Sequence, residues 1–179
     1  MNATSRGPFG PALCCLVALV LFPGVASAQG GRIQLDHLNR LAEKATETVD
    51  VTVDAEMLKK SAGFLAGKGT DTAKFQQVID GITGVYVKSF KFDMPGAYAS
   101  SDVETIRKQV AREGWSRIVG VREKDALNEI YLWKEGGANG GLVVISAESH
   151  ELTVVNIVGN IDLASLAALG PMIPKLGNR

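Results

Sequence analysis

Four apolar, β-branched segments follow one another in the second half of the chain with very short links between them. They span residues 115–122, 127–134, 141–147 and 152–158. A parallel strand pair needs a crossover of a dozen or more residues, whereas an antiparallel pair is closed by a tight turn. Links this short therefore require successive strands to pair antiparallel. The sequence predicts an antiparallel sheet, and this constrains the fold more than any other feature.

The links have the composition of hairpin turns. Lys124-Asp125-Ala126 and Ser149-His150 suit tight turns, and the glycine-rich run at 136–140 suits a looser one. That glycine run lies between two strands and lacks the Lys-Ser/Thr pair of a phosphate-binding loop, which in any case precedes a helix. We therefore interpret it as a flexible hairpin rather than a nucleotide site.

A fifth strand and a helix precede these four segments. Residues 85–92 predict a strand closed by Pro95-Gly96. The pattern Ser101-Asp102-Val103-Glu104 is a capping box, which predicts a helix over residues 102–113. Together with the strand at 115–122 they form a β-α-β unit. In one alternative, the two strands of this unit pair in parallel. The sheet is then mixed rather than wholly antiparallel.

Helical spacing of apolar residues dominates the N-terminal half. One helix is predicted over 35–45, a second is capped by Asp54, and a third begins at Asp71 or Thr72. Residues 49–53 alternate and predict either a short strand or an extended link. Asp162 caps a last short apolar helix over 163–169. The predicted fold class is α+β: a four- to five-stranded, mainly antiparallel sheet with helices packed on one face and a helical N-terminal half.

The first 28 residues have the pattern of a cleavable signal peptide. An apolar run at 11–22 is followed by Pro23-Gly24 and by Ala26-Ser27-Ala28, a small-x-small cleavage site. The run is about 12 residues long, against roughly 20 for a membrane span. Cys14 and Cys15 lie inside this apolar run, whereas a cysteine that receives a lipid lies just after it. We predict a signal peptide at 1–28, a flexible leader at 29–34, a single domain at 35–170 and a frayed tail at 171–179.

The charge of the mature chain limits its partners. Removing Arg6 with the signal peptide leaves 18 basic residues against 19 acidic ones, out of 19 of each in the whole chain. Binding to nucleic acid requires a basic face, so a nucleic-acid partner is not expected. No second apolar run is long enough for a membrane span, so we predict a soluble periplasmic or extracellular protein rather than a lipid-anchored one.

Candidate catalytic groups are scattered. The mature chain has two histidines, His37 and His150, without metal-ligand spacing between them. Ser61 and Ser101 lie on a helix surface and at a cap, and no Gly-x-Ser-x-Gly elbow is present. Carboxylates at strand ends and turns offer a glycosidase pair in principle, although solvated faces explain them equally well: Asp93, Glu123, Asp125, Glu129 and Glu135. We predict no catalytic, cofactor-binding or metal-binding residue and no cofactor.

Aromatic residues line two of the predicted strands. Tyr131 and Trp133 alternate along one, and Tyr86, Phe90 and Phe92 share a face of the other. If one set faces solvent, it forms an apolar patch of the kind that binds ligands or partners. If helices and a partner cover both faces, the aromatic residues belong to the core.

Three segments together resemble the domain-of-unknown-function family 4252, found in secreted and lipid-anchored bacterial proteins. They are the glycine-bounded strand at 82–90, the helix-to-strand junction at 113–119 with Val121-Arg122-Glu123, and the closing segment at 152–163. The resemblance extends over residues 35–169. It implies no agreed activity and no catalytic residues, and this chain departs from the lipid-anchored members because it lacks a usable lipid-attachment cysteine.

The sequence therefore favours a non-catalytic exported envelope protein that binds a partner or a small ligand. One alternative is an envelope hydrolase whose acidic residues, with His37 or His150, converge in a cleft. Another is a regulatory component of an envelope stress system.

Overall fold

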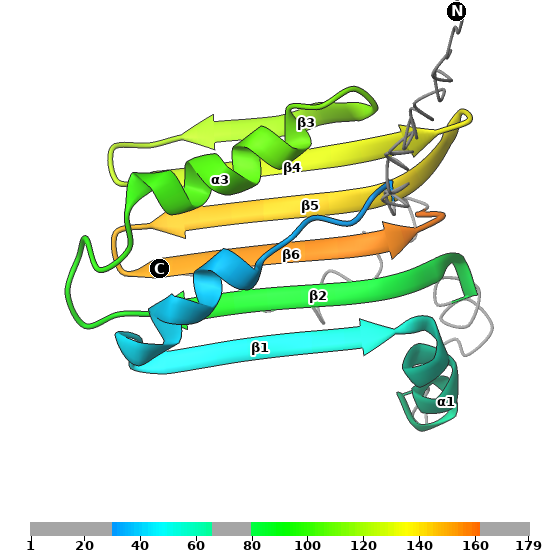
Figure 1. Ribbon diagram of the computed structural model, residues 1–179, viewed down its shortest axis with the longest axis horizontal. Helices are drawn as coiled ribbons and strands as arrows, with labels where there is room; N and C mark the ends of the chain where they lie inside the picture. The colour runs from blue at the N-terminus through cyan, green and yellow to red at the C-terminus, as the bar shows by residue number, and fades with distance from the viewer. Residues whose placement is uncertain (1–29, 66–79, 162–179) are drawn as a thin grey trace, which may run out of the picture.

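A single antiparallel sheet organises the molecule (Figure 1). The structure, a computed structural model, describes residues 30–65 and 80–161. Its elements are η1 (Asp36–Glu43), β1 (Glu47–Asp54), α1 (Ala55–Leu65), β2 (Ile82–Lys91), α3 (Ser100–Val110), β3 (Trp115–Arg122), β4 (Ala126–Glu135), β5 (Ala138–Glu148) and β6 (Glu151–Gly159). The strand order is β1-β2-β6-β5-β4-β3, and every neighbouring pair is antiparallel.

The hairpins predicted from the short links are confirmed. β5 and β6 are joined by Ser149-His150 between the paired residues Glu148 and Glu151. β4 and β5 are joined by Gly136-Gly137, whose φ angles of 57° and 88° fit a two-residue turn with positive φ at both positions. Such a turn is strained for any residue except glycine, which explains the glycines here.

The sheet has six strands, so the prediction of four to five was too low. The additional strand is β1, which lies where the sequence left a strand or an extended link open, and it pairs with β2 along its whole length. The parallel alternative for the β-α-β unit is wrong as well. β2 and β3 run in the same direction, but β6, β5 and β4 lie between them because the chain crosses the sheet through α3.

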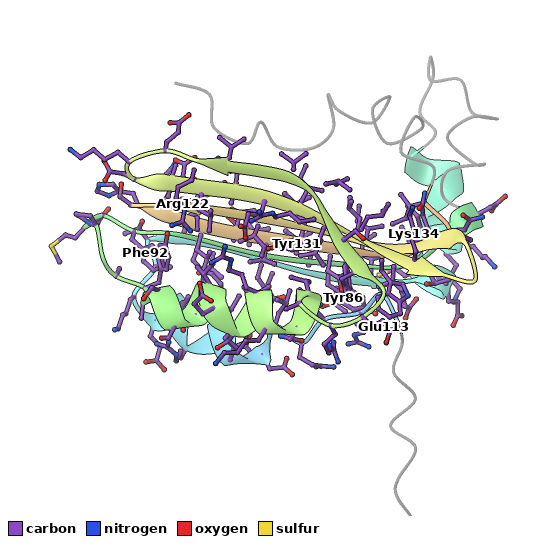
Figure 2. All side chains as sticks on the ribbon, turned by 90° about the horizontal axis from the view of Figure 1, so that it is seen from above. Tyr86, Phe92, Glu113, Arg122, Tyr131 and Lys134 are labelled. Carbon is purple, nitrogen blue, oxygen red and sulfur yellow. The ribbon has the colours of Figure 1, made fainter. Side chains whose placement is uncertain are left out.

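Both η1 and α3 lie on one face of the sheet, as the side view in Figure 2 shows. Leu38 and Leu41 of η1 and Ile106 of α3 are fully buried there against Phe90 and Val143. We call this the helix face and the opposite side the open face. α+β is thus the correct class, although the described N-terminal half contains β1 as well as helices.

The start of α3 differs from the predicted capping box by two residues. The helix begins at Ser100, and the residue before it is Ala99. Asp102, not Glu104, reaches back to accept a hydrogen bond from the Ala99 N–H at 2.9 Å. The buried Asp102 carboxylate also forms an ion pair with Arg40 of η1. It therefore links the two helical elements.

The segment before η1 is held against the sheet, in contrast to the flexible leader predicted at 29–34. The side chain of Asn156 on β6 accepts a hydrogen bond from the Ile33 N–H at 3.0 Å and donates one to the Gly31 carbonyl at 2.8 Å. Gly31 lies so close to β5 that a Cβ on Gly141 would be 2.6 Å from its Cα. One buried amide on a distant strand thus fixes Gly31 and Ile33.

Several sequence predictions lie outside the described residues. They are the signal peptide at 1–28, most of the helix expected after Asp71 or Thr72, the helix at 163–169 and the tail at 171–179. The cap of the second helix is described and confirmed, because Asp54 accepts a hydrogen bond from the Met57 N–H at 2.8 Å.

Candidate functional site

The open face carries aliphatic side chains on all six strands. Side chains alternate between the two faces of a sheet, and the pairing registers align those that share a face. Leu132, Leu142 and Ile161 form a buried apolar cluster there, separate from the core on the helix face. The other aliphatic residues on the open face are Val49, Val51, Val53, Val85, Val87, Val119, Val121, Ile130, Val144, Val155 and Ile157.

Exposure on the open face is lowest around Leu132 and Leu142 and highest at its two edges. Leu132 on β4 is 4% exposed and Leu142 on β5 is 7% exposed. At the edges, Val49 on β1 is 40% exposed and Val121 on β3 is 46% exposed. Solvent-exposed aliphatic residues on edge strands favour association with another surface, and natural proteins generally avoid them otherwise.

The aromatic residues are not part of the open face. Tyr131, Phe90 and Phe92 belong to the core on the helix face, and Tyr86 packs against that core. Trp133 packs on Trp115 with ring centroids 5.6 Å apart. Both aromatic sets singled out in the sequence thus point to one side, and the candidate binding surface is aliphatic rather than aromatic.

Glu129 is the most deeply buried of the carboxylates considered as catalytic candidates. It is 1% exposed and lies on the helix face of β4. Arg107 of α3 donates to both of its oxygens, at 2.9 and 3.0 Å. Arg117 of β3 and the Tyr131 hydroxyl donate to it as well, each at 3.0 Å. This network joins α3 to β3 and β4.

The environment of Glu129 keeps it ionised. Burial raises its pKa, but the hydrogen bonds from Arg107, Tyr131 and Arg117 outweigh burial and hold the pKa below its usual value. Burial raises the pKa of the Tyr131 hydroxyl, which therefore stays protonated and donates. A carboxylate with its acceptor positions filled by three donors has a structural role, and a general acid needs the opposite pKa shift.

The other candidate groups do not gather around Glu129. The Nε2 atom of His37 lies 3.2 Å from the Asp102 carbonyl, and the Nδ1 atom of His150 lies 3.2 Å from the Phe92 carbonyl. Asp93, Glu123 and Asp125 are exposed, Ser101 lies in the first turn of α3, Ser61 lies in α1, and Glu135 ends β4. Across residues 30–65 and 80–161, no three His, Cys, Asp or Glu side chains are placed to hold a metal ion.

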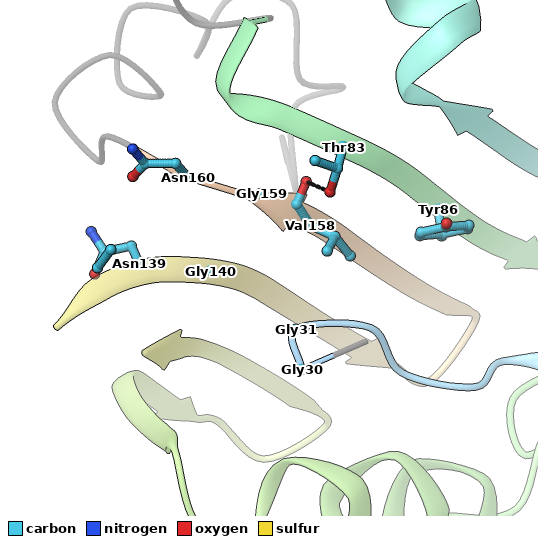
Figure 3. A pocket seen from close by; sticks show the side chains of 10 residues that line it. Gly30, Gly31, Thr83, Tyr86, Asn139, Gly140, Val158, Gly159 and Asn160 are labelled. Atoms are coloured by element: carbon cyan, nitrogen blue, oxygen red, sulfur yellow. Dashed lines mark hydrogen bonds between the residues drawn. The ribbon is translucent and has the colours of Figure 1, made fainter. Parts of the chain in front are cut away.

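A pocket of about 440 Å³ lies at one end of the sheet (Figure 3). Thr83, Tyr86 and Asn139 line it together with several glycines, and no described lining residue is Asp, Glu or His. Thr83 already donates to the Val158 carbonyl at 3.1 Å, and Asn139 donates to the Ile161 carbonyl at 2.9 Å. The side chains of Thr83 and Asn139 are therefore already engaged within the fold.

Comparison with known proteins identifies a family. The model of DUF4252, a domain of unknown function, matches residues 43–169, which is well over half of the chain. Comparisons with curated proteins and with solved structures gave no significant match. Within the described part of the chain, every helix is too short or too polar to cross a membrane. The resemblance seen in the sequence is thereby confirmed, and the chain belongs to the DUF4252 family.

Proposed function

We propose that the chain is an exported, non-catalytic binding domain whose open face receives the apolar surface of a protein partner in the cell envelope. One observation carries the proposal: the edges of the open face expose valines on β1 and β3 to solvent. Burying apolar surface stabilises an association by about 25 cal/mol per Å². The edges therefore provide a driving force for docking.

A protein surface suits this face better than a small ligand does. Small-molecule sites are concave and combine apolar walls with a few polar groups that orient the ligand. The open face spreads over adjacent strands, and its valines, leucines and isoleucines offer no hydrogen bonds. Two hydroxyl side chains on the same face, Ser89 and Thr153, already bond each other at 2.7 Å. Protein interfaces have apolar, extended cores of this kind.

Export is supported by the apolar run at 11–22 and the Ala26-Ser27-Ala28 site. The first described residues, Gly30 and Gly31, already pack against the sheet. These residues follow the proposed cleavage site, so a mature chain that begins at Gln29 keeps the contacts that they make with the sheet.

Mass spectrometry of the protein recovered from the envelope or the medium tests export. We expect the chain to begin at Gln29, with its N-terminal glutamine wholly or partly cyclised. Ala28→Leu removes the small residue before the cut, and we expect it to leave the intact precursor. Recovery of wild-type protein that still begins at Met1 in the cytoplasm would contradict the proposal.

Two charges on the open face should abolish partner binding. Val119→Lys/Val121→Lys places both lysines at the exposed edge on β3, where apolar contact would leave them desolvated and unpaired. We expect the amount of partner captured by this variant to fall tenfold or more. A tenfold loss of affinity corresponds to about 1.4 kcal/mol of binding free energy. The measurement is cross-linking in cells that export the full chain, followed by quantitative mass spectrometry of the captured proteins.

A matched control carries the same added charge on the opposite layer. Ser101→Lys/Thr105→Lys lies on the exposed side of α3 and should capture the same protein as the wild type. Circular dichroism and melting temperature establish that both variants remain folded. A set of captured proteins that is identical for the two variants excludes the open face as the binding surface.

A further inference from the structure

The sheet ends in two strands that are paired on one side alone, β1 and β3, at its opposite edges (Figure 1). Among the described strands, none pairs with the outer side of either one. An edge strand presents a row of free N–H and C=O groups, and natural proteins protect it with Lys, Pro or a bulge. β1 has none of these, because it reads Glu-Thr-Val-Asp-Val-Thr-Val-Asp and pairs with β2 without a shift in register. β1 is therefore able to accept another strand.

The two edge strands carry opposite charges. The charged residues of β1 are Glu47, Asp50 and Asp54, all acidic. Those of β3 are Arg117 and Arg122, both basic. Like charges on paired strands destabilise the pairing, whereas opposite charges stabilise it. The charges thus disfavour β1 against a second β1 and β3 against a second β3, and they favour β1 of one copy against β3 of another.

The number of strands allows this pairing between copies that have the same orientation. All neighbouring strands are antiparallel, so in a sheet of six the two edge strands run in opposite directions. When a second copy is placed beside the first in the same orientation, its β1 runs antiparallel to the β3 of the first. The open faces of the two copies then lie on the same side, and the sheet continues across the junction with its alternation of faces intact.

One register matches the side chains on both faces. With Val121 opposite Val51, these valines meet on the open face, and so do the next two valines along, Val119 and Val53. On the other face, the same register places Arg122 opposite the acidic residue that precedes Val51. Pairs of β-branched residues and pairs of opposite charges are both among the stabilising cross-strand pairs.

The charged side chains of this register are free to meet. Arg122 is exposed, and no ion pair found among the described residues includes it. Asp50 pairs with Lys88 of its own sheet, but its side chain is still 52% exposed and has room for a second cation. An arginine from another copy would therefore add to the existing pair rather than replace it.

The regular part of each strand ends at the same point of the junction. β3 has a bulge between Arg117 and Val119, and bulges interrupt regular pairing. β1 ends at Asp54, where α1 begins. In the register above, Asp54 comes directly after the residue opposite Val119, so it faces the bulge. The bulge thus limits the junction to residues 50–53 and 119–122 without preventing it.

We propose that the chain associates edge to edge with copies of itself, residues 50–53 of one copy pairing antiparallel with residues 119–122 of the next. This head-to-tail contact leaves one β1 and one β3 free at the two ends, so further copies can add. The junction is short, which makes the association reversible and dependent on concentration. The pairing enlarges the open face instead of covering it, and it does not depend on the partner proposed above.

A disulfide between copies tests both the contact and its register. Cys14→Ala/Cys15→Ala removes the two cysteines of the full chain, and Val51→Cys or Val121→Cys is then added to give two single-cysteine proteins. Directly opposite residues of an antiparallel pair have Cα atoms about 4.5–5.5 Å apart, a distance that a disulfide bridges. The two proteins are mixed and mildly oxidised, and peptide mass spectrometry identifies which residues are joined.

Two matched controls separate the proposed register from random collision. Val49→Cys takes the place of Val51→Cys, because Val49 is similarly exposed on the same face of β1 but lies two residues away. Diagonal neighbours are about 7–8 Å apart, beyond the reach of a disulfide. Arg122→Glu tests the charge pair, and Lys124→Glu makes the same change of charge just beyond the end of β3.

We expect the mixed disulfide between Val51→Cys and Val121→Cys to exceed either like disulfide at least tenfold. Val49→Cys should give at least tenfold less of the mixed product. Adding Arg122→Glu should lower its yield several-fold, whereas Lys124→Glu should leave it unchanged. The melting temperature of each variant, compared with that of the wild type, establishes that the fold is retained.

Three outcomes would overturn the proposal. The first is mixed and like disulfides in statistical proportions. The second is an excess of one like disulfide, which would assign the association to two copies of the same strand. The third is an equal yield from Val49→Cys and Val51→Cys, or from Arg122→Glu and Lys124→Glu, because the register then has no support. Since no partner enters the experiment, its failure leaves the proposed function untouched.

Discussion

Replacing Glu129 with glutamine is expected to lower the free energy of unfolding by about 3 kcal/mol. Glutamine keeps the shape of the side chain but removes its charge. The Arg107 guanidinium, which donates to both carboxylate oxygens, then lacks a full counter-charge in a largely buried position. Removal of one partner of a buried ion pair costs about 3–5 kcal/mol, and the lower end applies because Arg107 keeps some contact with water. Denaturant unfolding of the wild type and the variant measures the difference.

Glu104→Gln is the matched control, because Glu104 pairs with the same arginine from an exposed position. Exposed ion pairs contribute about 0–1 kcal/mol, so this variant should stay within 1 kcal/mol of the wild type. Equal losses in the two variants would contradict the structural role assigned to Glu129.

The pH dependence gives a second measure of the same network. The pKa of Glu129 is lower in the folded protein than its ordinary value of 4.5, so its contribution to stability is complete above that value and declines as the pH falls below it. The difference in stability between the wild type and Glu129→Gln should therefore shrink on acidification below about pH 4.5. A difference that stays constant down to pH 2 would contradict the lowered pKa.

Glu129 also shows where sequence reasoning stops. The short links sufficed to predict the hairpins from β3 to β6, because a tight turn permits one pairing geometry. The sequence does not distinguish Glu129 from the other carboxylates at strand ends and turns, and its partner Arg107 lies on a helix 22 residues earlier. One clue was present: Glu129 shares its strand face with Leu127 and Tyr131, where a charge needs a buried partner.

An exposed apolar patch was expected from the aromatic residues of the strands, whereas the exposed residues of the open face are aliphatic. Strands covered on both faces have nearly continuous apolar sequences, whereas strands covered on one face alternate. β5 contains Leu142, Val143, Val144 and Ile145 in succession, which indicates two apolar faces. The aromatic candidates carry no sign of this second apolar face, because Tyr131, Phe90 and Phe92 belong to the core on the helix face. What covers an apolar face depends on tertiary contacts, and local periodicity does not contain them.

Asn156→Ala is expected to release the N-terminal segment and to lower the free energy of unfolding by about 2–3 kcal/mol. The fully buried Asn156 side chain hydrogen-bonds the Ile33 N–H and the Gly31 and Leu142 carbonyls. Alanine leaves these backbone groups without that partner, and an unsatisfied buried group costs about 1–3 kcal/mol. Denaturant unfolding gives the stability change, and amide hydrogen exchange at Ile33 should accelerate at least tenfold.

Gln109→Ala is the control for Asn156, because Gln109 makes two hydrogen bonds to the backbone of the adjacent Gln34 in an exposed position. Water replaces those bonds when they are lost, so the expected change is below 1 kcal/mol. If both variants lose the same stability, burial of the amide is not what holds the segment. If the exchange rate at Ile33 does not change in Asn156→Ala, apolar packing of Ile33 and Leu35 holds it instead. The predicted outcome would show that Gly31 and Ile33, shortly after the proposed cleavage site, are held in the fold by the Asn156 amide on β6.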